Sequence, residues 1–175
     1  MPLIECIRQN QAAAIRSTCD ENSCLINFTG FRDMVILKGE ITRDECGIIA
    51  STKFGNKMCD CMFFLSNEIK ALAIVELSKT KERDPSAVKQ KFDNSSEIVR
   101  TILIACRKNP NTLKIAFIYV TNCVKRKKKR IFNTISESKH FRGINIRLYG
   151  RPYPILIANS GTVLTPADVA TQFFN

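Results

Sequence analysis

Two carboxylates interrupt apolar segments near the middle of the chain. Asp60 lies in KMCDCMFFL and Glu76 lies in ALAIVEL, among residues suited to burial. A carboxylate in an apolar strand carries a desolvation cost unless it is paired or bound to a cation. Mg²⁺ takes one or two carboxylates together with water and phosphate oxygens. These residues therefore allow two interpretations: a divalent-cation site, or a strand hairpin whose two acids face solvent.

The elements around the acids predict an antiparallel hairpin. The two apolar runs have strand length, and the polar residues SNE separate them. On such a hairpin, the same-face neighbours of Asp60 and of Glu76 are mainly apolar. Periodicity alone leaves both interpretations open.

The rest of the chain predicts one α/β domain over residues 1–175, with a mixed central sheet flanked by helices. The core is expected over about 1–123, and a basic helix and C-terminal strands over about 124–165. In the helix expected over residues 85–106, the polar residues DNSS weaken the middle. The expected helices are 3–17, 85–106 (with Asp84 as N-cap) and 125–138, and the expected strands are 24–28, 33–41, 48–50, 113–121, 144–150, 153–158 and 161–164.

The cysteines and the N-terminus favour a cytoplasmic protein without a membrane segment. No run approaches the ~20 apolar residues that a membrane helix needs, and MPLIECIRQNQ lacks a basic start followed by an apolar run. The eight cysteines are scattered, several within apolar runs such as TILIAC. We expect them to be mostly small buried residues rather than a disulfide framework.

Positive charge is concentrated in one segment. The net charge is +11, and residues 125–151 contain ten Lys and Arg against one acid, Glu137. Such a block favours binding to a polyanion, nucleic acid first and an anionic membrane second. A solvated helix face or a nuclear-import tail is the simpler alternative. The densest part, and the expected nucleic-acid contact, is Lys125, Arg126, Lys127, Lys128, Lys129 and Arg130.

The order acid, hairpin, VELSK and a helix with an early glutamine resembles the PD-(D/E)XK nuclease superfamily, which has the restriction-endonuclease-like fold. The resemblance covers about residues 1–125 and implies a core of helix, antiparallel meander, helix and strand. It implies that Asp60, Glu76 and the Leu77 carbonyl bind Mg²⁺ or Mn²⁺, and that Gln90 positions water or phosphate. In some members an acid from the first helix also contributes, for which Glu5 is the candidate.

One residue departs from the family pattern. The family places a lysine two residues after the second acid, where this chain has Ser78, and Lys79 follows one position later. A shift of one residue turns a side chain to the opposite face of a regular strand. Three explanations remain: a bulge that restores Lys79 to the site, a lysine from the next helix (Lys89 or Lys91), or a site that has lost its chemistry and kept binding.

The resemblance implies a metal-dependent endonuclease, with DNA favoured over RNA as substrate. It also implies an effector or subunit of a larger antiviral-defence or repair assembly, with a protein partner or as a homo-oligomer. Lys79 or a migrated lysine would assist the attacking water, and the basic segment would hold the phosphate backbone. The alternatives are a catalytically degenerate nuclease fold that binds nucleic acid or serves assembly, and a basic α/β scaffold that contacts an acidic protein or membrane surface.

Overall fold

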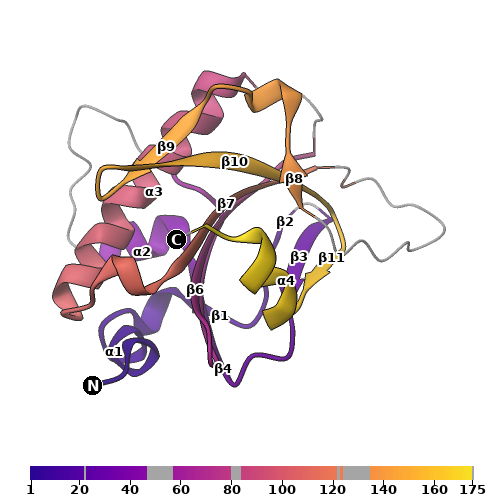
Figure 1. Cartoon of the computed structure of the whole chain (residues 1–175). Helices are drawn as coiled ribbons and strands as arrows, with labels where there is room; N and C mark the ends of the chain where they lie inside the picture. The colour runs from indigo at the N-terminus through magenta and orange to yellow at the C-terminus, as the bar shows by residue number, and fades with distance from the viewer. Residues whose placement is uncertain (22, 47–56, 80–83, 122, 124–134, 175) are drawn as a thin grey trace.

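A mixed β-sheet with helices forms the framework of the chain. The computed structural model describes residues 1–21, 23–46, 57–79, 84–121, 123 and 135–174 (Figure 1). Within these residues the main sheet has the strand order β1-β4-β5-β6-β7-β10-β8, and β9 pairs with β10. The sheet is mixed because β4, β5 and β6 are antiparallel neighbours, whereas β6, β7 and β10 run parallel.

The predicted hairpin is confirmed as β5 (Cys61–Ser66) and β6 (Lys70–Leu77). Nearly every residue of both strands is buried, as expected for strands covered on both faces. β4 (Asp33–Lys38) pairs with the other edge of β5 and completes an antiparallel meander.

The second long helix and the buried strand after it are also confirmed. α3 (Pro85–Ala105) has Asp84 as its N-cap, and the Asp84 side chain accepts a hydrogen bond from the Ser86 amide. β7 (Lys114–Thr121) then lies parallel to β6. The remaining main-sheet strands are β1 (Ile15–Arg16), β8 (Ser136–Glu137), β9 (Asn145–Leu148) and β10 (Arg151–Asn159).

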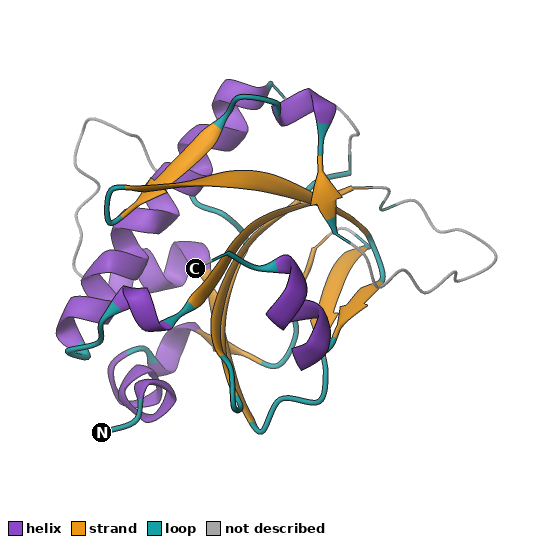
Figure 2. Cartoon of the chain, viewed as in Figure 1, coloured by secondary structure: helices purple, strands orange, loops and turns teal. Residues whose placement is uncertain are grey.

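The two faces of the sheet are covered by different elements (Figures 1 and 2). One face packs against α1 (Leu3–Asn10), α2 (Gly39–Glu45) and α3. The other packs against α4 (Pro166–Gln172) and a small sheet with the order β11-β3-β2. The small sheet consists of β2 (Asp20–Glu21), β3 (Cys24–Phe28) and β11 (Thr162–Leu164), and single 3₁₀ turns occupy Ala12–Ala14, Pro110–Thr112 and Lys139–Phe141.

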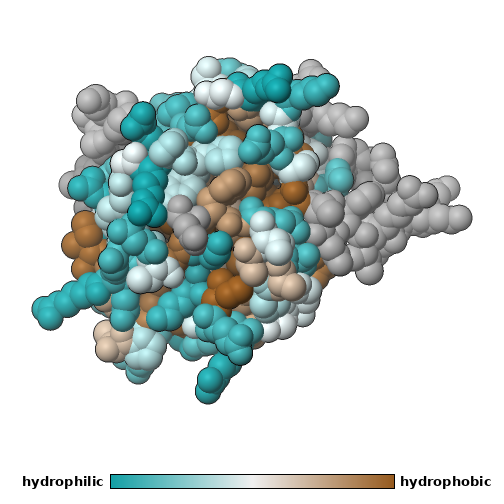
Figure 3. Space-filling view, in the orientation of Figure 1, coloured by the Kyte–Doolittle hydropathy of each residue, from teal (hydrophilic) through white to brown (hydrophobic). Residues whose placement is uncertain are grey.

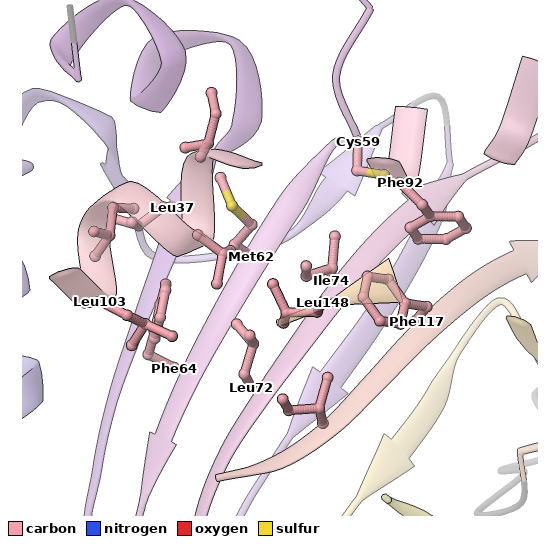
Figure 4. Packing of buried hydrophobic residues seen from close by; sticks show 14 of the residues in the cluster. Leu37, Cys59, Met62, Phe64, Leu72, Ile74, Phe92, Leu103, Phe117 and Leu148 are labelled. Atoms are coloured by element: carbon pink, nitrogen blue, oxygen red, sulfur yellow. The ribbon is translucent and has the colours of Figure 1, made fainter. Parts of the chain in front are cut away.

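Side chains of β5 and β6 alternate between two hydrophobic clusters. The cluster on the helix-covered face includes Met62, Phe64, Leu72 and Ile74, and Phe92 of α3 stacks edge-to-face on Phe117 of β7 (Figure 4). The opposite cluster receives the alternate positions of the same strands. A residue's position along β5 or β6 therefore decides which set of elements it meets.

Three local predictions are wrong. The first helix ends at Asn10 rather than near residue 17, because Gln11 leaves the helical conformation with a φ of −132°. The strand expected over 33–41 stops at Lys38, and α2 begins at Gly39. The DNSS sequence does not weaken α3, which continues through it because these polar side chains have partners inside the protein.

The cysteines are mostly buried, as expected, but the expectation that they form no disulfide framework is wrong. Six of the eight form disulfides, and Cys46 and Cys59 are free. The partners are far apart in the sequence and are brought together by the sheet and its coverings, so their spacing along the chain gave no signal. The pairs are Cys6–Cys106, Cys19–Cys61 and Cys24–Cys123.

Several predicted features lie outside the described residues. These are the strand at 48–50 and the basic run Lys125–Arg130 with most of its expected helix. The end of that expected helix differs, because Ser136–Glu137 form β8. Of the helices that the structure describes, none is long and apolar enough to cross a membrane.

Candidate functional site

The structure brings the two predicted acids together at one end of the hairpin. Asp60 directly precedes β5, and the register that pairs Cys61 with Val75 places it opposite Glu76. The Leu77 amide donates a hydrogen bond of 2.7 Å to Asp60 Oδ2. Opposite residues of an antiparallel pair share a face, and this is the face that α3 covers.

A close backbone approach fixes the position of Asp60. The Gly39 amide, at the start of α2, donates a hydrogen bond of 3.0 Å to the Asp60 carbonyl. A Cβ atom at position 39 would lie 1.9 Å from the Cys59 carbonyl oxygen. Only glycine permits this contact without displacing the chain. Gly39, which follows the last residue of β4, therefore fixes the position of the backbone that carries Asp60.

The middle of α3 holds the same segment from the other side. Ser95 Oγ accepts a hydrogen bond of 3.0 Å from the Cys59 amide, and Asn94 Nδ2 donates one of 2.7 Å to the Lys57 carbonyl. Both side chains are buried. Polar residues that look unfavourable in a helix thus satisfy the backbone of the segment leading to Asp60.

Glu76 is completely buried and forms an ion pair with a lysine of α3. Lys91 Nζ lies 2.6 Å from Glu76 Oε1, and the side chains are 20% and 0% exposed. Burial alone lowers the pKa of Lys91, but its hydrogen bond to Glu76 and the charge of that carboxylate outweigh burial and raise it. Lys91 is therefore a charged group held against the second acid.

The side chain of Asp60 forms a hydrogen bond with that of a third acid, Glu21 of β2. Burial, the charge of Glu76 and the hydrogen bond to Glu21 raise the pKa of Asp60 to about 8. At neutral pH Asp60 therefore carries a proton and donates it in a hydrogen bond to Glu21, which lowers the pKa of Glu21. Lys38 Nζ lies 3.1 Å from Glu21 Oε2 and balances its charge.

Sequence reasoning missed Glu21. It lies in STCDENS, whose polar turn-forming residues predict the end of the first helix rather than a strand. β2 has only two residues, and its position beside Asp60 depends on pairing with β3 and on the disulfides on both sides of it. Nothing local to this segment could have indicated that position.

The strand ladder continues without a bulge at Ser78. Leu77 pairs with Val120, and the Ser78 amide donates a hydrogen bond of 2.9 Å to the Val120 carbonyl. Ser78 is buried, whereas Lys79 is exposed. The regular ladder favours the second of the three explanations, a lysine from the next helix.

The other candidate residues lie at different places. Lys89 forms an ion pair with Asp93 on the surface of α3. Gln90 is half-buried on α3, next to Lys91 in the sequence. Glu5 is exposed in the first turn of α1. Of the lysines considered, Lys91 is the one that the structure places on a site carboxylate.

The donor set at this end of the hairpin suits a hard divalent cation that keeps several waters. Among the described residues, no group of three or more His, Cys, Asp and Glu side chains could hold a metal ion, so a cation here would have only the two hairpin acids as side-chain ligands. Mg²⁺ uses one or two carboxylates and fills its remaining positions with water and phosphate oxygens. Because the charge of Glu76 contributes to the raised pKa of Asp60, a cation between them would stabilise the ionised form of Asp60.

The described residues on either side of the basic run Lys125–Arg130 lie at the same end of the sheet as the acids. Cys123 Sγ is 2.9 Å from the Ser78 carbonyl oxygen, and Ser136 of β8 pairs with Ile157 of β10. Hydrophilic side chains cover the region of the 3₁₀ turn before β9, at the top of Figure 3. Within the described residues 135–151, the exposed basic residues are Lys139, Arg142, Arg147 and Arg151.

The fold and site define an α/β protein in which a half-buried acid, Asp60, and a buried acid, Glu76, lie with a lysine at one end of a mixed sheet. No model of a known protein family matches the chain, and neither a curated protein nor a solved structure matches it. Its function is therefore inferred from its own residues.

Proposed function

We propose that the chain is a metal-dependent endonuclease domain with a restriction-endonuclease-like core, and that it acts on DNA. The order of elements supports this: α1, the meander β4-β5-β6, α3, and β7 parallel to β6. The observation that carries the proposal is the placement of Asp60 opposite Glu76, with Lys91 bonded to Glu76.

In this proposal Asp60, Glu76 and the Leu77 carbonyl hold one Mg²⁺ or Mn²⁺ ion. The ion, when bound, polarises the scissile phosphate and lowers the pKa of a bound water. The Leu77 amide orients the Asp60 carboxylate, as its 2.7 Å hydrogen bond indicates. Gln90 is proposed to position the water or the phosphate.

Lys91 takes the role that the resemblance gives to the strand lysine. Its ammonium group is close to Glu76 and keeps its charge, because the hydrogen bond and the carboxylate raise its pKa. A cation at this position stabilises negative charge that develops on a transferring phosphoryl group. In this proposal neither Ser78 nor Lys79 has a catalytic role, and Lys79 is an exposed surface residue.

The basic segment supports DNA as the partner. Six consecutive Lys and Arg at 125–130 neutralise phosphates irrespective of base sequence, and the described flanks of this segment lie at the end of the sheet that bears the acids. The lack of a recognisable base-reading motif in the sequence is compatible with a subunit or effector that works with a protein partner or as a homo-oligomer, in defence or repair.

A nicking assay on supercoiled DNA with Mg²⁺ or Mn²⁺ tests the proposal. Asp60→Ala is expected to reduce cleavage by about 100-fold or more, and Asp44→Ala, at an exposed acid of α2, provides the matched control. Cleavage that is unaffected by Asp60→Ala would refute the site assignment. A single-stranded RNA substrate in parallel reactions tests the choice of DNA.

The role of Lys91 is tested in the same assay. Lys91→Ala is expected to lose cleavage, and Lys79→Ala to retain it, since Lys79 is exposed. Circular dichroism must show that both variants are folded. The opposite result would return the catalytic role to Lys79.

A second candidate function is a degenerate nuclease fold that binds nucleic acid without cutting it. The observation that favours it is the charge balance of the site, where Lys91 and Lys38 pair with Glu76 and Glu21 while Asp60 is protonated. It predicts DNA binding that weakens steeply with salt and no divalent-dependent cleavage.

A further inference from the structure

All of the net positive charge lies in residues 101–175. Residues 1–100 contain 14 Lys and Arg and 14 Asp and Glu, whereas residues 101–175 contain 13 Lys and Arg and only two acids, Glu137 and Asp168. The Asp168 side chain is used in the capping box of α4. The second part of the chain therefore cannot neutralise its own cations and depends on an anionic partner for this.

Three exposed cations of the second part have no acidic partner among the described residues. They are Lys139, Arg142 and Arg147, and none of the described acids forms an ion pair with any of them. Exposed cations of the first part, such as Arg8 and Arg100, do form ion pairs. The difference marks this surface as one that is open to an external anion.

Two of the three cations belong to the 3₁₀ turn between β8 and β9. Lys139 begins the turn and Arg142 directly follows it (orange, between β8 and β9 in Figure 1). The Ser138 hydroxyl accepts a hydrogen bond from the His140 amide, and the Arg142 amide donates one of 3.3 Å to the Lys139 carbonyl. The backbone of the turn therefore links the two cations.

A buried ring anchors this turn beside the acids. Phe141 is 3% exposed, and its ring packs edge-to-face on Tyr119 of β7, with the ring centroids 5.1 Å apart. The register of β6 and β7 places Tyr119 opposite Glu76. Both rings belong to the hydrophobic cluster on the face that α3 covers. The turn thus lies over the strand next to Glu76, on the face of the sheet that carries the site.

The third cation extends the positive surface along β10. Residues of β9 alternate, so that Ile146 and Leu148 are buried and Arg147 is exposed. Arg147 pairs with Pro152, which is also exposed. β8 and β9 both pair with β10, β8 near its end and β9 at its start. The cations therefore follow β10 from the end that bears the acids toward its beginning.

We propose that Lys139, Arg142 and Arg147 form a binding surface for the sugar-phosphate backbone of duplex DNA, and that the 3₁₀ turn holds the phosphates nearest to Asp60 and Glu76. The inference rests on the proposed function, since it concerns the substrate of the same site. A phosphate backbone carries negative charge at short, regular intervals, which a row of cations can follow irrespective of base sequence. The anchored turn gives this contact a fixed place relative to the acids.

Fluorescence anisotropy with a short DNA duplex in EDTA measures binding without cleavage. Lys139→Ala with Arg142→Ala is expected to raise the Kd by about 10-fold or more at low salt. It should also lower the slope of log Kd against log salt concentration by about 2, one for each lost phosphate contact. An unchanged slope would overturn the inference, and so would tighter binding of single-stranded RNA of the same length by wild type.

The matched control removes one arginine and one lysine at the opposite end of the β5–β6 hairpin. Arg32, directly before β4, and Lys70, at the start of β6, are both exposed there. Arg32→Ala with Lys70→Ala makes the same change in net charge and should raise the Kd by no more than about twofold. An equal loss of affinity in both double variants would overturn the inference, because net charge alone would then explain binding.

Cleavage with Mg²⁺ separates this inference from the proposed function. If the Lys139/Arg142 variant binds like wild type while Asp60→Ala abolishes nicking, the inference alone fails. If the variant loses affinity but wild type does not nick DNA, the endonuclease proposal fails, and the surface belongs to a protein that binds DNA without cutting it. Wild-type protein that does not bind the duplex at low salt would overturn both.

Discussion

The two ends of the β5–β6 hairpin carry acids in opposite surroundings. Glu68, in the turn, is exposed, whereas Glu76 at the other end is completely buried opposite Asp60. The same two strands connect both ends, so the strands alone do not explain the difference. It comes from what covers the open end: α3 with Lys91, the start of α2, and the Glu21 segment. Packing from distant parts of the chain turns these carboxylates into a candidate site.

The largest expected effect comes from removing the cation that pairs with Glu76. Lys91→Met leaves a completely buried carboxylate without its lysine and should lower the free energy of unfolding by about 3 kcal/mol or more. Lys89→Met is the control and should cost at most about 0.5 kcal/mol, because its ion pair with Asp93 is partly exposed. Urea unfolding followed by circular dichroism measures both, and equal losses would contradict the difference in burial.

The close approach at Gly39 gives the next largest effect. Gly39→Ala forces the Cys59–Asp60 segment away from α2 and should cost about 2 kcal/mol in the free energy of unfolding. Glu68→Ala, at the turn end of the hairpin, should change it by less than about 0.5 kcal/mol. Thermal and urea unfolding would show this contrast. Wild-type stability of Gly39→Ala would mean that the contact is not needed to place Asp60.

A smaller effect is expected from the hydrogen bond that α3 makes to the Asp60 segment. Ser95→Ala leaves the buried Cys59 amide without its acceptor and should cost about 1–2 kcal/mol. Ser86→Ala, exposed in the first turn of α3, should have little effect on urea unfolding. A neutral Ser95→Ala would show that this contact does not secure the open end of the hairpin.

The pH dependence of stability is a graded effect that is spread over several pH units. The pKa of Asp60 is raised from 3.8 to about 8, so between these values the folded protein holds a proton that the unfolded chain has released. The free energy of unfolding should therefore fall as pH rises through this window, by at most about 1.4 kcal/mol per pH unit. Metal-free protein should show this fall in urea unfolding, and Asp60→Asn should remove it. An identical slope in both proteins would contradict the raised pKa.

Much of the framework could be predicted because it follows from local patterns. Two apolar runs of strand length joined by a polar turn indicated the hairpin, and Asp84 with Pro85 indicated the start of α3. The meeting of Asp60 and Glu76 followed from the hairpin register. α4 was not predicted, although Thr165 and Asp168 form a capping box that the sequence displays.

The rest of the site depends on contacts between distant segments. Glu21 reaches Asp60 only because β3 and two disulfides position a two-residue strand. Lys91 could be named as one of two helix lysines, but the rotation of α3 over the sheet decides which of them meets Glu76. Neither the Glu21–Asp60 contact nor the Lys91–Glu76 contact follows from a periodicity or a spacing along the chain, so sequence patterns alone could not predict them.

We propose that the buried end of the hairpin, and not the turn end, is a catalytic centre. Divalent-dependent nicking of supercoiled DNA by wild type, Glu76→Gln and Glu68→Gln tests it most directly. We expect cleavage by wild type and Glu68→Gln, and a loss of about 100-fold or more in Glu76→Gln. Equal cleavage by the two variants, with both folded, would contradict it.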